Sequence, residues 1–283
     1  MSIFYDFVDI LGPSPFDTEK TEREYTGKLV LEMETLSPVF VGSGFEKSEN
    51  EILYKSFIRF LDKPVIPGSS IKGMLRTICQ AVSYSCIDVG KRIKKDLPYK
   101  SDNCNCIVCN TFGKMKLRSR VNIGDFVLEK GEQDIIRIPI QMNPHIENKD
   151  IYYSQDGKLR GIKFYRHGDY RILENTKIAV ETVTKGGVFT GEIIFHGLLK
   201  QQLELLCYAL GLDESFQPKV GGNKSGFFGS CVFKVKRAVL DSEDFDPSMY
   251  AKSYGASDTR IEQNKKKLCE ILSFDNRILS LWG

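Results

Sequence analysis

Residues 67–76 read Pro67-Gly68-Ser69-Ser70-Ile71-Lys72-Gly73-Met74-Leu75-Arg76 and predict a tight turn that leads into a helix. Proline and glycine end the apolar run at residues 64–66, and Ser69 or Ser70 is a natural N-cap. Apolar residues then recur at helical spacing. Hydroxyls in the first turn, with Lys72 and Arg76 on adjacent turns, favour a bound phosphate at this helix N-terminus. An ordinary capped helix with solvated basic side chains is the alternative.

Charge is unevenly distributed along the 283 residues, which suffice for one large domain or two smaller ones. The net charge is only +3, so the overall balance does not by itself indicate a nucleic-acid partner. Basic residues are concentrated between positions 91 and 120, and a second cluster with Arg160 and Lys163 lies among aromatic residues. Cations that bind phosphates and rings that stack on bases suit single-stranded nucleic acid. Either cluster alone also fits a solvated face.

The N-terminal sequence, Met1-Ser2-Ile3-Phe4-Tyr5-Asp6, has no basic segment followed by an apolar run, and no stretch of the chain reaches the length of a membrane span. We therefore expect a cytoplasmic protein without a membrane partner. Disulfides are rare in that compartment. Clustering among the eight cysteines thus favours a metal site.

Three cysteines lie close together in Cys104-Asn105-Cys106-Ile107-Val108-Cys109. Thiolates at this spacing can bind one tetrahedral ion, and nearby lysines lower thiol pKa values. A structural zinc ion needs a fourth ligand, for which Cys86 is the first choice and Cys79, on the apolar face of a predicted helix, the second. Reduced or incidental thiols are the alternative. A catalytic zinc is not favoured, because no His-Glu motif accompanies the cluster.

The predicted elements follow the order strand-helix-strand, strand-helix-strand, which is the βαββαβ order of a ferredoxin-like, RNA-recognition fold of the α+β class. The strands are expected near residues 28–36, 121–128, 188–195 and 231–235, and the second helix near residues 200–211. We expect an N-terminal arm (1–26), one domain (27–240) and a tail with an apolar helix (241–283). Two insertions interrupt the domain: residues 87–120, which hold the cysteines, and residues 141–180, predicted to form a long projecting hairpin.

A glycine-rich loop occupies residues 221–229, Gly-Gly-Asn-Lys-Ser-Gly-Phe-Phe-Gly. It is not a Walker A loop, because the glycine spacing is wrong and a strand follows. It is not a dinucleotide fingerprint either, because it does not open a helix. Its backbone N–H groups can approach a ligand closely, and Lys224 and Ser225 are available for a phosphate. A mobile surface turn is the alternative.

Taken together, these segments resemble the RAMP superfamily of CRISPR-associated proteins, specifically the backbone subunits of type III effector complexes. The resemblance runs in order over roughly residues 27–236. The turn at residues 66–76 and the loop at residues 222–229 are highly specific as a pair. The cysteine loop that runs into Thr111-Phe112-Gly113 directs the resemblance to the type III branch.

The resemblance implies a modified RNA-recognition fold whose subunits stack along a guide RNA, with target RNA and other RAMP subunits as partners. Residues 141–180, with Arg160 and Lys163, would correspond to the thumb that inserts between guide and target. The resemblance further implies that the serine turn and the late glycine loop contact the guide backbone, through Ser69, Ser70, Lys72, Arg76, Lys224 and Ser225. Such phosphate contacts hold an RNA without reading its sequence.

Catalytic subunits that resemble this chain cut target RNA with a divalent ion such as Mg²⁺ and an aspartate between the first glycine turn and the serine turn. Here no aspartate stands at that place; Glu51 comes closest in spacing, and Asp62 is the second candidate. A longer side chain displaces the carboxylate, so solvated loop acids are the favoured interpretation. We therefore expect a guide-RNA-binding subunit in antiviral defence. A metal-dependent target-RNA endonuclease, a guide-processing endoribonuclease and a zinc-ribbon protein acting through protein contacts are the alternatives.

Overall fold

The computed structural model describes residues 3–17, 23–87, 104–139, 149–157, 159–170, 176 and 178–279. Most of the basic run after residue 90 and parts of the predicted hairpin at 141–180 therefore lie outside the described residues. The described residues form a mixed α+β fold with several sheets, as the sequence predicts.

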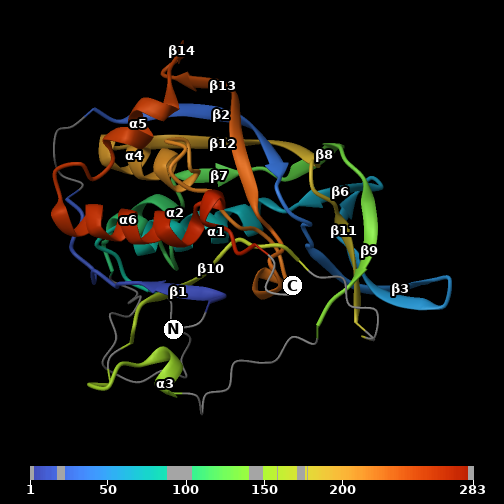
Figure 1. Ribbon diagram of the computed structural model, residues 1–283. Helices are drawn as coiled ribbons and strands as arrows, with labels where there is room; N and C mark the ends of the chain where they lie inside the picture. Colours follow the sequence, from blue (N-terminus) through green and yellow to red (C-terminus); the bar gives the residue numbers. More distant parts are fainter. Residues whose placement is uncertain are drawn as a thin grey trace.

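A large antiparallel sheet forms the centre of the molecule (Figure 1). Its strands lie in the order β14-β13-β2-β12-β8-β6-β5, and β7 also pairs with β12. The strands of this sheet are β2 (Tyr25–Thr35), β5 (Arg59–Phe60), β6 (Lys63–Ile66), β7 (Val121–Ile123), β8 (Phe126–Lys130), β12 (Val188–Leu198), β13 (Cys231–Leu240) and β14 (Glu243–Asp244).

The helices lie mainly on one side of this sheet (Figure 1). They are α1 (Gly68–Ala81), α2 (Ile107–Phe112), α4 (Lys200–Ala209), α5 (Pro247–Ser253) and α6 (Thr259–Leu272). Helix α1 follows β2 and precedes β8, and α4 joins β12 to β13. The four strands β13-β2-β12-β8 with these two helices form the predicted βαββαβ unit.

The core lies between the central sheet and the helices. Alternate residues of β2, namely Leu29, Leu31 and Met33, are fully buried, whereas Glu32 and Glu34 face away and pair with lysines of β13. This alternation is typical of an antiparallel sheet with one face in the core and one face in solvent. Apolar residues of α1 and α4 join the same cluster.

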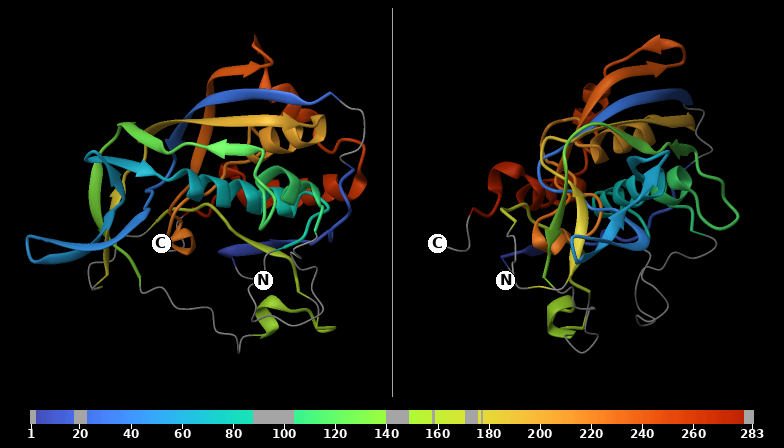
Figure 2. Two further views of the ribbon diagram at one scale, coloured as in Figure 1. Left: turned by 180° about the vertical axis from the view of Figure 1, so that it is seen from behind. Right: turned by 90° about the vertical axis from the view of Figure 1, so that its right-hand side faces the viewer.

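Two smaller sheets flank the main body (Figure 2). One has the order β3-β4-β11-β9, and the other pairs β1 with β10. The strands are β1 (Tyr5–Val8), β3 (Gly42–Glu49), β4 (Ile52–Phe57), β9 (Gln133–Arg137), β10 (Ile162–Tyr165) and β11 (Ala179–Val183). The short helix α3 (Lys149–Tyr152) and the 3₁₀ turns η1 (Lys224–Gly226) and η2 (Phe274–Asn276) complete the described elements.

Three local predictions differ from the structure. Neither Ser69 nor Ser70 caps α1: the helix begins at Gly68 with no hydrogen bond from an N-cap side chain. The strand predicted at residues 121–128 is split into β7 and β8. Strand β10 lies inside the predicted hairpin at 141–180. It forms an antiparallel pair with β1, which belongs to the predicted N-terminal arm. In the described part of the chain, no helix is long and apolar enough to cross a membrane.

Candidate nucleic-acid interface and metal centre

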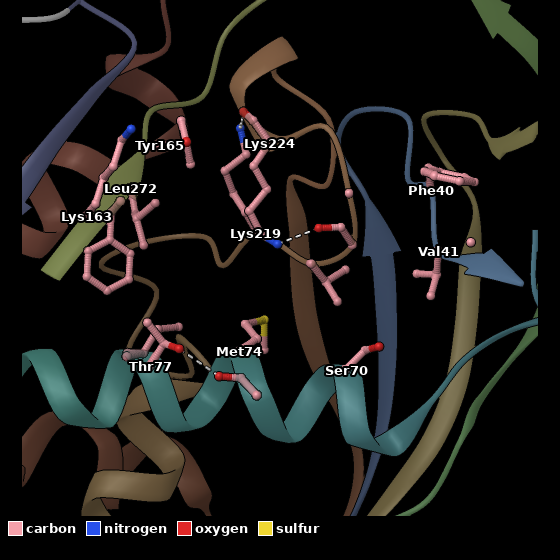
Figure 3. Close-up of a pocket in the computed structure, with 17 residues that line it drawn as sticks. Phe40, Val41, Ser70, Met74, Thr77, Lys163, Tyr165, Lys219, Lys224 and Leu272 are labelled. Atoms are coloured by element: carbon pink, nitrogen blue, oxygen red, sulfur yellow. Dashed lines mark hydrogen bonds between the residues drawn. The ribbon is translucent and has the colours of Figure 1, made fainter. Parts of the chain in front are cut away.

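A cleft of about 510 Å³ opens between the first turns of α1 and the glycine-rich loop (Figure 3). Ser70, Met74 and Thr77 of α1 lie on one side of this cleft, and residues 219–224 lie opposite. Strand β10 and the segment 40–42 close the two ends. The cleft therefore brings together three parts of the sequence predicted to bind RNA: the serine turn, the glycine-rich loop and the aromatic basic cluster.

The described residues that line this cleft carry positive charge only. Lys163, Lys219 and Lys224 are among the lining residues, and no aspartate or glutamate is. Low-dielectric walls lined by one sign of charge concentrate counter-ions of the opposite sign. The cleft is therefore suited to an anion.

Lys219 is buried at the floor of the glycine-rich loop, with only 5% of its surface exposed. Its Nζ donates hydrogen bonds to two backbone carbonyl oxygens, those of Arg166 (2.9 Å) and Lys224 (3.4 Å). Burial disfavours the charged ammonium, and the nearby charge of Lys224 adds repulsion, so the pKa of Lys219 falls to about 7. An anion in the cleft would offset both effects and stabilise the protonated amine.

The glycine-rich loop packs closely against the segment that ends at Phe40. The Gly222 N–H donates to the Phe40 carbonyl oxygen (2.8 Å), and Gly221 has φ +84°. A Cβ on Gly221 would lie 2.3 Å from that same oxygen, so only glycine fits there. Lys224 is held in this loop, and burial lowers the pKa of its amine. Ser225 follows it on the exposed side of the loop. This packing favours an ordered loop over a mobile surface turn.

Helix α1 separates the predicted RNA-binding residues into two groups. Ser70 faces the cleft, and Ser69 is exposed beside it in the first turn. Lys72 and Arg76 contact the cysteine-containing insertion instead. Lys72 Nζ donates to Ser119 Oγ (2.8 Å), and burial with the neighbouring Arg76 charge lowers its pKa. Lys72 and Arg76 therefore tie α1 to the insertion.

The two basic residues of the predicted thumb lie apart. Lys163 is in strand β10 and lines the cleft. Arg160 lines a separate polar cavity of about 240 Å³, together with Arg260 of α6. Its Nε donates to the Tyr153 carbonyl oxygen (3.1 Å).

Four cysteines form a compact cluster at the end of α1 and the start of α2. The sulfur atoms of Cys86, Cys104, Cys106 and Cys109 all lie within 4.8 Å of one another. The Sγ–Sγ distance is 3.4 Å between Cys86 and Cys109, and 3.8 Å between Cys86 and Cys106. Sulfur atoms bound to one tetrahedral zinc ion, at about 2.3 Å each, are about 3.8 Å apart. The four residues therefore fit a metal such as zinc.

The predicted alternative for the fourth ligand, Cys79, is buried in the core, and its Sγ lies 4.0 Å from the Leu205 carbonyl oxygen. Cys86 takes the fourth position of the cluster. Arg76 connects this cluster with α1: its Nη2 lies 3.7 Å from Cys109 Sγ, and its Nη1 donates to the Gly113 carbonyl oxygen (2.8 Å). A guanidinium beside thiolates offsets the negative charge of a four-thiolate centre.

The two candidate catalytic acids lie at the tips of different hairpins. Glu51 has φ +64° and occupies, with Asn50, the two-residue turn between β3 and β4. Asp62 has φ +63° and occupies, with Leu61, the turn between β5 and β6. Both acids are exposed. Among the described residues, the cysteine cluster is the only group of three or more side chains suited to hold a metal ion. Neither acid belongs to such a group in the described part of the chain, and a catalytic role for either one stays a prediction.

Sequence reasoning did not find Lys219 or Phe40, although both belong to the cleft. Lys219 lies two residues before the glycine-rich loop, and this position in the sequence is a usable signal. Its burial could not be predicted, because lysine is almost never fully buried. The sequence predicts Phe40 as part of a strand. Only the packing of the glycine-rich loop against it shows that Phe40 lies in the wall of the cleft.

Comparison with known proteins agrees with this geometry. No curated protein matches the sequence. A protein-family model described as the RAMP superfamily matches residues 32–232, a range that contains strands β8 and β12 and both helices of the βαββαβ unit and includes parts of β2 and β13. This match covers well over half of the chain. The chain therefore belongs to the RAMP superfamily of CRISPR-associated proteins.

Proposed function

We propose that this protein is a guide-RNA-binding backbone subunit of a type III CRISPR effector complex and acts in antiviral defence. Membership of the RAMP superfamily supports an RNA-binding role, with other CRISPR-associated subunits as partners. The type III assignment rests on the cysteine loop that runs into Thr111-Phe112-Gly113. Guide RNA and target RNA are the proposed nucleic-acid partners.

The observation that carries the proposal is the cleft between α1 and the glycine-rich loop. Three lysines, the hydroxyl of Ser70 and closely approaching glycine backbone surround it, and its described lining has no acidic residue. Cations, hydroxyls and backbone N–H groups bind phosphate oxygens, and such contacts carry no sequence information. A subunit that holds guides of any sequence needs this kind of site.

The cysteine cluster has a structural role in this proposal. Cys86, Cys104, Cys106 and Cys109 would hold a zinc ion that crosslinks the end of α1 to the insertion. Arg76 and Lys72 add polar contacts between the same two elements. Because Ser70 lies on α1, the orientation of this helix sets one side of the cleft. The metal would thus maintain the RNA-binding geometry at a distance.

Fluorescence anisotropy with labelled single-stranded RNA of two unrelated sequences tests the proposal. Lys224→Ala is expected to weaken binding of both RNAs about tenfold. The slope of log K against log salt should also fall by about 0.7 for the one phosphate contact that is lost. Lys219→Met should weaken binding in the same way, because methionine fills a similar volume without charge.

Lys252→Ala is the matched control, because Lys252 is an exposed lysine of α5 outside the cleft. It should leave both the affinity and the salt slope unchanged. Equal affinity of Lys224→Ala, Lys219→Met and the wild-type protein at every salt concentration would rule out the cleft as the RNA site. Copurification of the chain with guide RNA and the other subunits of a type III complex tests the finer assignment.

A further inference from the structure

The two-stranded ribbon of β1 and β10 has one buried face and one open face. Its antiparallel register places Tyr5 opposite Tyr165 and Phe7 opposite Lys163. Directly opposite residues share a face, so these four side chains lie together. The other face is turned to the core, where Val8 is fully buried.

The open face carries a continuous group of aromatic rings around one ammonium group. The Tyr5 ring centroid lies 6.1 Å from that of Tyr165 and 5.8 Å from that of Phe7. Tyr152 of α3 extends the group, with its ring centroid 6.2 Å from that of Phe7. Lys163 Nζ lies 3.7 Å from the Tyr5 ring centroid, 4.8 Å from that of Tyr165 and 5.4 Å from that of Tyr152.

Packing into the hydrophobic core does not explain why aromatic side chains occupy these positions. All four are partly exposed, and none belongs to the hydrophobic core or to the partly buried side chains that pack against it in the described structure. Mutual ring contacts stabilise the ribbon, but a strand pair that only needed a core face has that face already, through Val8 and Phe164. Partly exposed aromatic rings beside a cation are the usual surface for stacking unpaired bases.

This open face continues the wall of the cleft. Lys163 and Tyr165 belong to both surfaces. The charge of the open face also favours RNA. Asp6, the acidic residue of β1, forms ion pairs with Lys267 (2.7 Å) and Arg166 (3.3 Å), which offset its negative charge. A strand of RNA whose phosphates lie in the cleft would therefore contact the aromatic rings and Lys163 where it leaves the cleft beside β10.

We propose that the open face of the β1–β10 ribbon stacks the unpaired bases of RNA that leaves the cleft. Tyr5 and Tyr165 are the principal stacking residues, and Lys163 is the phosphate contact between them. The bases must be unpaired, because ring stacking needs base faces that a duplex keeps covered. This inference rests on the proposed RNA-binding function. It assigns to the N-terminal strand a role that the cleft alone does not require.

The test compares two labelled oligonucleotides of equal length: a single-stranded oligouridylate, and the corresponding abasic ribose-phosphate chain. Tyr5→Leu and Tyr165→Leu should each weaken binding of the oligouridylate about tenfold, and leave binding of the abasic chain unchanged. Tyr5→Phe keeps the ring and should bind the oligouridylate like the wild-type protein. Thermal unfolding of each variant shows that the fold is intact, and the Tyr165→Leu variant tests the face if Tyr5→Leu unfolds.

Failure of this inference and of the proposed function give different results. If Lys224→Ala weakens binding of both oligonucleotides and the leucine variants bind like the wild-type protein, the cleft binds RNA and the stacking face is wrong. Equal losses for the abasic chain and the oligouridylate in the leucine variants would also contradict stacking. If the wild-type protein binds neither oligonucleotide, the proposed function and this inference are both overturned.

Discussion

The carboxylate of Asp125 caps helix α1: its Oδ1 accepts a hydrogen bond from the Gly68 N–H at 2.8 Å. The predicted strand at 121–128 breaks between β7 and β8, which lets Asp125 reach the helix. The close approach of this segment to the start of α1 also explains why residue 68 is a glycine. A Cβ on Gly68 would lie 2.0 Å from the Ile123 carbonyl oxygen. The turn before α1 is therefore shaped by a segment more than fifty residues further along the chain.

Loss of this cap should destabilise the protein moderately. Asp125→Ala leaves the Gly68 N–H at the positive end of the helix without its acceptor, and the expected loss in free energy of unfolding is about 1 kcal/mol. Asp125→Asn keeps an acceptor oxygen and should lose less. Urea denaturation measures both. An alanine variant as stable as the wild-type protein would show that the carboxylate contributes nothing to the helix.

The metal centre predicts a joint loss of metal, stability and RNA affinity. Purified protein should contain about one zinc ion per chain, and a strong chelator or Cys109→Ser should lower the melting temperature. RNA binding should weaken with it, because α1 carries Ser70 and is tied to the cluster through Arg76. Metal analysis, thermal unfolding and anisotropy follow the three effects.

Cys269→Ser is the control for the metal centre, because Cys269 is a partly buried cysteine outside the cluster. It should keep the zinc ion and the RNA affinity. Retention of a full equivalent of zinc by Cys109→Ser would contradict the four-cysteine assignment.

Lys219 predicts that RNA affinity depends on pH. Its pKa is about 7 in the free protein, and a bound phosphate favours the protonated amine. Affinity should therefore rise as the pH falls from 8 to about 6, and the Lys219→Met variant should lack this component. Anisotropy titrations across this range measure it. Identical pH profiles for the wild-type protein and Lys219→Met would show that Lys219 does not contribute to RNA binding.

The same residue predicts the pH dependence of stability in the RNA-free protein. The pKa of Lys219 is about 7 in the folded state and near its ordinary value of 10.5 in the unfolded state. Between these values the unfolded state binds the additional proton, so this residue makes stability rise with pH. Below pH 7 Lys219 is protonated in both states, so the free-energy cost of burying its charge is fully present. Urea denaturation at pH 7 and pH 9 should show a larger gain for the wild-type protein than for Lys219→Met.

His167 predicts acid sensitivity. Its Nε2–H donates to the carbonyl oxygens of Gln217 (3.0 Å) and Leu272 (2.9 Å), and its Nδ1 accepts from Ser230 Oγ (2.7 Å). This arrangement needs a neutral ring, and burial, with repulsion from Lys219, lowers the pKa of His167 to about 3.

Because the unfolded His167 side chain titrates near pH 6.5, acidification below that value favours the unfolded state. The expected loss is about 1.4 kcal/mol per pH unit until the folded group also titrates. Urea denaturation from pH 7 to pH 4 measures the loss. His167→Gln should be less stable at pH 7 and lose less on acidification. His196→Gln, at an exposed histidine, should follow the wild-type profile.

Alanine at Glu51 or Asp62 should not abolish cleavage of target RNA by the assembled complex. The two acids lie at the tips of separate hairpins, and neither belongs to a group of three or more potential metal ligands among the described residues. Gel analysis of the cleavage products of complexes with Glu51→Ala or Asp62→Ala subunits checks this. Disappearance of one product band at unchanged target affinity would instead identify that acid as catalytic.

Local sequence signals predicted much of the fold. Helical spacing after the Pro67-Gly68 turn, alternation in β2 and the order of strands and helices each depend on neighbours within a few residues, and the structure confirms them. The cysteine cluster was predictable for a similar reason, because three of its four members lie within the six residues 104–109. The identity of Cys86 as the fourth member was a choice between two cysteines that the fold resolved.

Long-range packing decided the rest. No local pattern indicates that Asp125 caps α1, that Lys219 is buried, or that β1 pairs with β10, because each depends on segments dozens or hundreds of residues apart. The residue types that can bind phosphate and metal are recognisable from the sequence alone. Their positions around α1 depend on packing: Ser70 lies in the cleft, whereas Lys72 and Arg76 contact the insertion. A helix directs its side chains all around its axis, and only its packing partners determine which of them meet the ligand.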